Sequence, residues 1–333
     1  MQALFSIKMK ASVRQQKRSK SIQKRREPLT VCIASICHAG TMIVGASDRM
    51  ITSGEDTEFE VPTLSETRQL APVLKTVRLD NYIIAMTSGD SGFQADAMQN
   101  VLARCNELKQ QHPNSRLRVR DAARLYVDFC NEAKRQASTD IILSRLGLDL
   151  EGFYSRQANM SPEFIRLVTE QLFQIVVGDP VIFAGIDDIG TQIYQANGDG
   201  ISSCNMIGWV AIGIGGRHAE SQFMLAEHTR LDSFGDTALL TYIAKKRSQV
   251  APGVGKQTDM FWINDRGYQN FSAEHIDALD KIYKKLEDDQ GKALSDAKAA
   301  VHQYIEEEKK REAQKRAKNP PEPPPPNPSE TST

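Results

Sequence analysis

Three predicted β-hairpins limit the folds open to this chain more than any other feature of its sequence, because a pair of predicted helices separates the first two from the third. Runs rich in β-branched residues on either side of short turns indicate the hairpins. They cover residues 30–46, 77–87 and 181–196. Strict alternation of strands and helices would favour a parallel sheet, whereas hairpin blocks separated by helix pairs favour antiparallel sheets with helices outside them. We therefore expect an α+β fold.

Further elements are predicted between and after these hairpins. Single strands are expected at 207–212 and 259–264, and the polar segment 52–71 is expected to form a long loop. Apolar residues recurring at intervals of three and four predict the helices. These are 98–108, 119–133, 217–229, 236–247, 276–286 and 294–305, with a less regular helical region at 139–175. The last two make up a helical extension, 272–318, whose charge-rich end is typical of a solvated helix.

The two ends of the chain differ in composition from the segment between them. Residues 1–26 contain nine basic side chains and no acidic one, so we expect 1–29 to be a disordered basic arm or a propeptide. An arm of this charge suits weak, salt-dependent contact with nucleic acid. Residues 319–333 hold seven of the 14 prolines and are expected to be a disordered, proline-rich tail.

Composition excludes several classes of protein. Hydrophobic residues make up 40% and charged residues 25%, which is ordinary for a soluble globular chain. Equal numbers of basic and acidic residues, 42 of each, argue against a general nucleic-acid binder. The sequence has no run of 18 apolar residues, so no transmembrane helix is expected. The five cysteines form no CxxC pair and no secretory signal is evident, so a cytoplasmic location is expected.

The sequence contains no complete cofactor-binding or metal-binding motif. The loop Gly213–Gly216 follows a strand and precedes a helix, but His218 stands where a dinucleotide-binding loop needs its third glycine. No phosphate-binding GxxxxGK[ST] loop, HExxH pair or GxSxG turn occurs. Cys32 and Cys37 are expected to be small core residues rather than nucleophiles. Neither a metal nor an organic cofactor is therefore expected.

One set of residues with catalytic potential remains, spread over the first two hairpins. Thr30 opens the first strand, and the second strand ends in Gly45-Ala46-Ser47-Asp48-Arg49. Lys75 directly precedes a strand that leads through its hairpin to Ser88-Gly89-Asp90. In this order and spacing the chain resembles the proteasome β-subunits of the N-terminal nucleophile (Ntn) hydrolases. The resemblance covers roughly residues 30–270.

Later segments extend the resemblance. Gly185-Ile186-Asp187 matches the family's G-x-D hairpin, and Gly213–Gly216 matches its GSGS-like loop before a helix. The resemblance implies a four-layer αββα sandwich of two antiparallel sheets over residues 30–271, to which the helical extension 272–318 is added. It also implies a peptide or protein substrate and assembly into a homo-oligomer.

The chemistry of such a site depends on a free α-amine. A threonine hydroxyl needs an adjacent base, and an α-amine titrating at about 7.7–8.0 can accept its proton. By resemblance, Thr30 is nucleophile and base, Lys75 is the catalytic lysine, and Gly89 supplies the oxyanion-hole amide. Asp48 corresponds to the carboxylate that fixes the lysine, with Ser47 as the alternative alignment.

Four departures leave other functions open. Residue 30 is preceded by Leu29 rather than glycine, so its amine is blocked unless the arm is removed or the true start lies later. Ile214 and Gly216 stand where the family has serines, and 248–257 lacks the family's Asp-x-x-Ser-Gly-Gly segment. Residues 139–175 and 272–318 have no counterpart in an ordinary β-subunit. The alternatives are a catalytically inactive, proteasome-like structural subunit and an interaction protein that binds nucleic acid or anionic surfaces through its arm.

Overall fold

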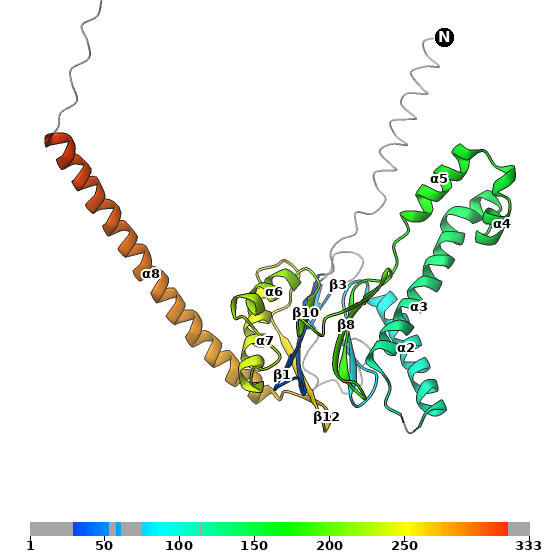
Figure 1. Ribbon diagram of the computed structural model, residues 1–333, viewed down its shortest axis with the longest axis horizontal. Helices are drawn as coiled ribbons and strands as arrows, with labels where there is room; N and C mark the ends of the chain where they lie inside the picture. The colour runs from blue at the N-terminus through cyan, green and yellow to red at the C-terminus, as the bar shows by residue number, and fades with distance from the viewer. Residues whose placement is uncertain (1–28, 53–57, 61–74, 114, 319–333) are drawn as a thin grey trace, which may run out of the picture. The chain divides into compact units, whose positions relative to one another are not determined.

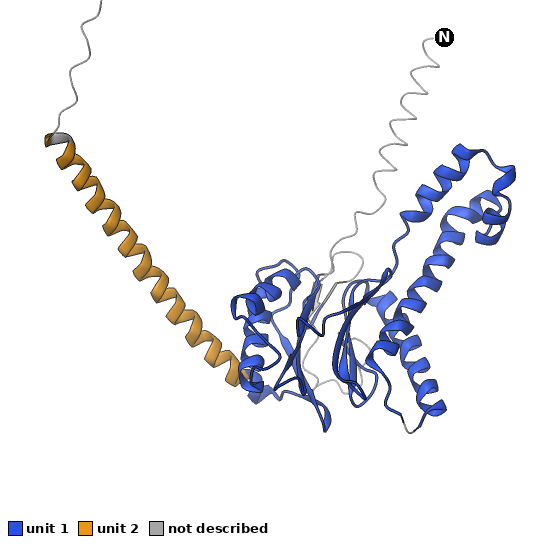
Figure 2. Cartoon of the chain, in the orientation of Figure 1, with its two compact units in different colours: residues 1–276 blue, residues 277–333 orange. Residues whose placement is uncertain are grey.

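The computed structural model describes residues 29–52, 58–60, 75–113 and 115–318. The chain divides into two compact units that meet between Ile276 and Asp277 (Figure 2). Except for Leu29, the predicted basic arm lies outside the described residues, and so does the proline-rich tail.

The first unit is built on two five-stranded antiparallel sheets (Figure 1). The strand order is β10-β1-β2-β11-β12 in the first sheet and β5-β6-β7-β8-β9 in the second. The strands are β1 (Cys32–Cys37), β2 (Met42–Asp48), β5 (Thr76–Arg78), β6 (Ile83–Thr87), β7 (Val181–Asp187), β8 (Gly190–Asn197), β9 (Gly200–Ser203), β10 (Trp209–Ile212), β11 (Thr258–Asn264) and β12 (Gly267–Asn270). The predicted α+β class with antiparallel sheets is confirmed.

All three predicted hairpins are present. In the first, β1 and β2 pair in a register that sets Cys32 opposite Ser47 and Cys37 opposite Met42. Every residue of β1 is buried, because this strand is covered on both faces. A side chain on either face of such a strand must therefore be apolar or hydrogen-bonded.

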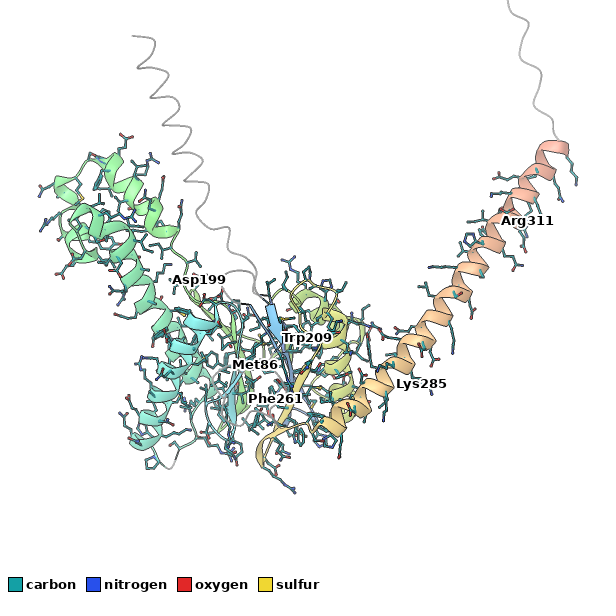
Figure 3. All side chains as sticks on the ribbon, turned by 180° about the vertical axis from the view of Figure 1, so that it is seen from behind. Met86, Asp199, Trp209, Phe261, Lys285 and Arg311 are labelled. Carbon is teal, nitrogen blue, oxygen red and sulfur yellow. The ribbon has the colours of Figure 1, made fainter. Side chains whose placement is uncertain are left out.

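One hydrophobic core fills the space between the sheets. It joins residues of β1 and β2 to residues of β6, β7 and β8. Met86 of β6 and Phe261 of β11 both belong to it (Figure 3). The phenyl ring of Phe261 lies against Gly45, where a side chain would overlap the ring.

Two helix pairs cover the outer faces of the sheets (Figure 1). Helices α2 (Ser91–Gln111) and α3 (Val119–Ser138) share a core with the second sheet. Helices α6 (Gly216–Leu225) and α7 (Phe234–Ser248) share another core with the first sheet. The layers therefore run from helix pair to sheet to sheet to helix pair.

The irregular helical region after α3 forms a small core of its own. Leu143, Phe153 and Val168 are buried there together. The region consists of the π-helix η2 (Thr139–Leu143), the 3₁₀ helices η3 (Ser144–Leu146) and η4 (Gln157–Asn159), and the α-helices α4 (Leu150–Ser155) and α5 (Pro162–Phe173). This agrees with the predicted less regular helical segment.

Three predictions of local structure are wrong. Of the predicted loop 52–71, only Thr52 and residues 58–60 are described, and these belong to the paired strands β3 (Met50–Thr52) and β4 (Glu58–Glu60), while the rest of the segment lies outside the described residues. The four-residue strands β9 and β12 were not predicted, since neither has the alternating apolar pattern of a half-buried strand.

The third error concerns the helical extension, which is one helix rather than two. Helix α8 (Ala273–Lys318) runs without a break through Gly291. Glycine in a helix costs about 1 kcal/mol relative to alanine, too little to stop a helix with favourable flanking residues. Most side chains of α8 after Glu287 are exposed. No helix in the described part of the chain is both long and apolar enough to cross a bilayer.

Candidate active site

Thr30 lies two residues before β1 and is only 2% exposed. Its Oγ1 donates a hydrogen bond of 2.6 Å to Oδ1 of Asp48, the last residue of β2. The ladder between β1 and β2 continues past the paired strands, since the Asp48 N–H donates to the Val31 carbonyl at 3.2 Å. Hairpin register therefore brings together the predicted nucleophile and the predicted carboxylate.

The Asp48 side chain is completely buried and accepts hydrogen bonds on both oxygens. Two side chains donate to it, and so do three backbone amides. The donors are Thr30 Oγ1 (2.6 Å), Lys75 Nζ (2.7 Å) and Val31 N (3.0 Å) to Oδ1, and Gly255 N (2.9 Å) and Met50 N (3.2 Å) to Oδ2. A buried carboxylate is tolerated only when its charge is compensated in this way.

Of the two alignments open in the sequence, the structure places Asp48 in this cluster. Ser47 pairs with Cys32 on one side of β2 and with Asp259 of β11 on the other. Adjacent residues of a strand point to opposite faces of the sheet, so only one of the two can face Thr30.

Lys75 reaches the cluster from the second sheet. It directly precedes β5, and its carbonyl accepts a 2.7 Å hydrogen bond from the Thr87 N–H at the end of β6. Its Nζ donates to Asp48 Oδ1 and also to Thr30 Oγ1. The Lys75 side chain is 12% exposed. The three predicted side chains thus meet where the ends of two sheets come together.

Gly89 is not joined to this cluster by a hydrogen bond in the described part of the chain. It is exposed, lies two residues beyond Thr87, and has a left-handed backbone with φ of +93°. An added Cβ would overlap the carboxylate of Asp179, which accepts a 3.1 Å hydrogen bond from the Asp90 N–H. Only glycine fits at this position without displacing Asp179.

The predicted glycine loop lies against the backbone of Thr30. Gly215 donates its N–H to the Thr30 carbonyl at 3.1 Å. Gly213 has φ of +86°, and a Cβ there would overlap the same carbonyl oxygen. Ile214 and Gly216 carry no hydroxyl, so this loop contributes backbone groups rather than side-chain donors.

A second loop at the site was missed in the sequence. Besides the Gly255 amide that donates to Asp48, Gly253 packs against the side chain of Leu29. The only sequence signal for this loop is the pair of glycines in Pro252-Gly253-Val254-Gly255. Thr30 remains linked to Leu29 by a peptide bond, so its nitrogen is an amide and not a base.

Cys32 lies beside the cluster but has the character of a core residue, as expected. It is fully buried, and its Sγ donates to the Thr87 carbonyl at 3.4 Å. Burial raises the pKa of its thiol to about 12, although the nearby ammonium of Lys75 opposes this. The thiol is therefore protonated at neutral pH and is a poor nucleophile.

Within the described residues, no three His, Cys, Asp or Glu side chains converge as a metal-binding group would require. The sequence matches no protein-family model and shows no significant similarity to a curated protein.

Proposed function

We propose that this protein is a threonine-type amide hydrolase, built as a proteasome-like, four-layer αββα Ntn hydrolase. The observation that carries the proposal is the contact of one hydroxyl, one ammonium and one carboxylate at Thr30, Lys75 and Asp48. These residues come from separate segments of the chain, and their order in the sequence alone predicts all three as site residues.

The proposed reaction begins once the bond between Leu29 and Thr30 has been hydrolysed. The freed α-amine takes the proton of Thr30 Oγ1, and the oxygen attacks the carbonyl carbon of a peptide bond. The C–N bond of the resulting tetrahedral intermediate breaks, and the leaving amine receives that proton. Water then hydrolyses the threonyl ester, which releases the acid and restores the hydroxyl.

Lys75 and Asp48 have electrostatic roles in this proposal. A nearby ammonium favours the neutral form of the α-amine, which is the form able to accept a proton. It also stabilises negative charge as it develops on Oγ1. Asp48 holds the ammonium in place through the 2.7 Å ion pair. The exposed amide at Gly89 is proposed to donate to the oxyanion of the intermediate.

A proteasome-like subunit without activity is the second candidate. Leu29, which stands before Thr30 where the family has a glycine, and the lack of a hydroxyl at residues 213–216 favour it. In that case the buried ion pair serves only to join the two sheets. Assembly into a homo-oligomer is proposed for both candidates on the resemblance alone.

Mass spectrometry combined with peptidase assays distinguishes the two. For the hydrolase, active preparations contain a chain that begins at Thr30, Thr30→Ser retains partial activity, and Thr30→Ala has none. An active preparation in which residues 29 and 30 are still joined, or full activity in Thr30→Ala, would rule out the threonine mechanism. A protein that is never cleaved and never active supports the structural subunit.

A further inference from the structure

Lys245, on helix α7, is fully buried although it carries an ammonium group. Lysine is almost never fully buried unless its charge is compensated. Here Nζ donates to two backbone carbonyl oxygens, that of Gly255 at 2.9 Å and that of Lys256 at 2.8 Å. An ammonium has three donors and can hold several carbonyls at once, as a bound cation does.

Both carbonyls belong to the loop between α7 and β11, the loop that also reaches the candidate active site. Gly255 donates its N–H to Asp48 Oδ2 at 2.9 Å and accepts from Lys245 on its C=O. A single residue therefore connects the buried ammonium to the buried carboxylate. The chain of contacts runs from Lys245 through Gly255 to Asp48.

Two further side chains hold the same loop. Gln249 donates its Nε2 to the Lys256 carbonyl at 3.0 Å, and Arg49 donates to the Gln257 side chain, also at 3.0 Å. These contacts are exposed, whereas the Lys245 contact with Gly255 is buried. Desolvated hydrogen bonds to a charged donor are the stronger kind, so Lys245 anchors the loop more firmly than Gln249 or Arg49 does.

We propose that Lys245 is a positioning residue for the reaction proposed above, on which this inference rests. Its ammonium fixes the loop so that the Gly255 amide stays on Asp48 Oδ2. That hydrogen bond orients the carboxylate, whose other oxygen holds Lys75 and Thr30. Lys245 touches neither the nucleophile nor the substrate, and acts on them only through the loop and Asp48.

Lys245→Met tests the proposal, because methionine keeps most of the side-chain volume and removes the charge. Lys256→Met is the matched control, since it removes one positive charge from the same loop but at an exposed side chain. Full-length variants are compared by steady-state kinetics and by hydrogen exchange of the peptide covering 249–259. We expect Lys245→Met to exchange faster there and to lose kcat about 100-fold, the cost of slightly misplacing a catalytic group, with KM nearly unchanged. Lys256→Met should match wild type in both.

The two readouts separate the failure of this inference from that of the proposed function. Unchanged exchange in Lys245→Met overturns the loop anchor whatever the activity. Faster exchange with unchanged kcat overturns the positioning role. If the wild type shows no hydrolysis that depends on Thr30, the proposed function fails, and the positioning role of Lys245 fails with it. Hydrogen exchange of the peptide 249–259 still tests in that case whether Lys245 anchors the loop.

Chemical rescue covers the case in which Lys245→Met does not fold. Lys245→Ala is prepared with propylammonium, which replaces the missing atoms, or with propanol, which has similar size and no charge. Recovery of the folded protein with propylammonium alone supports the anchor. Equal recovery with propanol, or no recovery with either, contradicts it.

Discussion

Thr30 Oγ1 donates a hydrogen bond of 2.6 Å to Asp48 Oδ1, and three backbone amides also donate to the Asp48 carboxylate. The carboxylate therefore has a fixed orientation, and it receives Lys75 from the other sheet. The contact between the Thr30 hydroxyl and the Lys75 ammonium is thus a consequence of how the sheets are packed, and mutations at each contact have separable effects.

Asp48→Asn should be among the most damaging substitutions in the protein. It preserves shape but leaves the Lys75 ammonium without its counter-charge, and breaking a buried ion pair in this way costs about 3–5 kcal/mol. We expect a lower urea midpoint and a loss of activity of about 100-fold or more, as for a misplaced catalytic group. Ser47→Ala is the control, because Ser47 is the other aligned residue. Equal loss of activity in both variants would contradict the assignment of Asp48.

Lys75→Met should lower kcat far more than it raises KM. The ammonium is proposed to act on the α-amine and on Oγ1, which change charge only during the reaction. Lys109→Met removes a charge from another ion pair of the same unit, Lys109 with Asp80, and should retain activity. Steady-state kinetics of both variants check this. A rise in KM alone for Lys75→Met would indicate substrate binding instead.

Gly213→Ala should be worse than an ordinary glycine substitution. A left-handed backbone costs a non-glycine residue about 1–2 kcal/mol, and at Gly213 the new Cβ would also displace the Thr30 carbonyl. Gly147 has a similar left-handed backbone, with φ of +67°, but nothing lies within 4 Å of an added Cβ. Gly147→Ala should therefore lose only the stability that a left-handed backbone costs a non-glycine residue, and it should keep the activity of the wild type. Denaturant melts and assays on the two variants give the comparison.

Thiol reagents should not abolish the proposed activity of the folded protein. All five cysteines are buried, and burial raises the pKa of the Cys32 thiol to about 12 and those of Cys37 and Cys105 to about 11. A disulfide reagent at pH 8 should therefore label the cysteines only after unfolding. Rapid labelling of Cys32 in the folded protein, with loss of activity, would point to a cysteine nucleophile.

The same shifts predict a loss of stability in alkali. The folded state keeps these thiols protonated while the unfolded state releases its protons near pH 9, so the unfolded state binds fewer protons above that value. Their contribution to the free energy of unfolding is complete below pH 9 and falls as pH rises toward 12. Replacing Cys32 with alanine should reduce this dependence, as measured by denaturant melts between pH 8 and pH 11.

Much of the fold was predictable because its hairpins have strong local signals. The runs that form β1, β2 and β7 are rich in β-branched residues and bounded by turns, so the presence of these strands follows from the sequence. The strands β9 and β12 are short and largely polar, and each pairs with one neighbouring strand, β8 and β11 respectively. Such pairing leaves no periodic signal in the sequence.

For the candidate site, the sequence predicts which side chains take part but not which backbone amides support them. Thr30, Asp48 and Lys75 follow a recognisable order along the chain, but a shift of one residue along β2 exchanges Asp48 for Ser47, and sequence alone does not fix that register. The amides of Gly215 and Gly255 are backbone groups, which any residue would carry. In the sequence, Lys245 cannot be told from an exposed lysine of a helix, because its burial depends on tertiary packing.

The most direct test of Thr30 as the proposed nucleophile is covalent labelling of its hydroxyl. A β-lactone inhibitor acylates an activated threonine hydroxyl, and peptide mapping by mass spectrometry locates the adduct. We expect one ester, on Oγ1 of a Thr30 that has become the first residue of its chain. Labelling should be lost in Lys75→Met, and the loss of peptidase activity should match the fraction labelled. Peptidase activity that persists with Thr30 unlabelled, or an adduct on another residue that accounts for the inhibition, would contradict it.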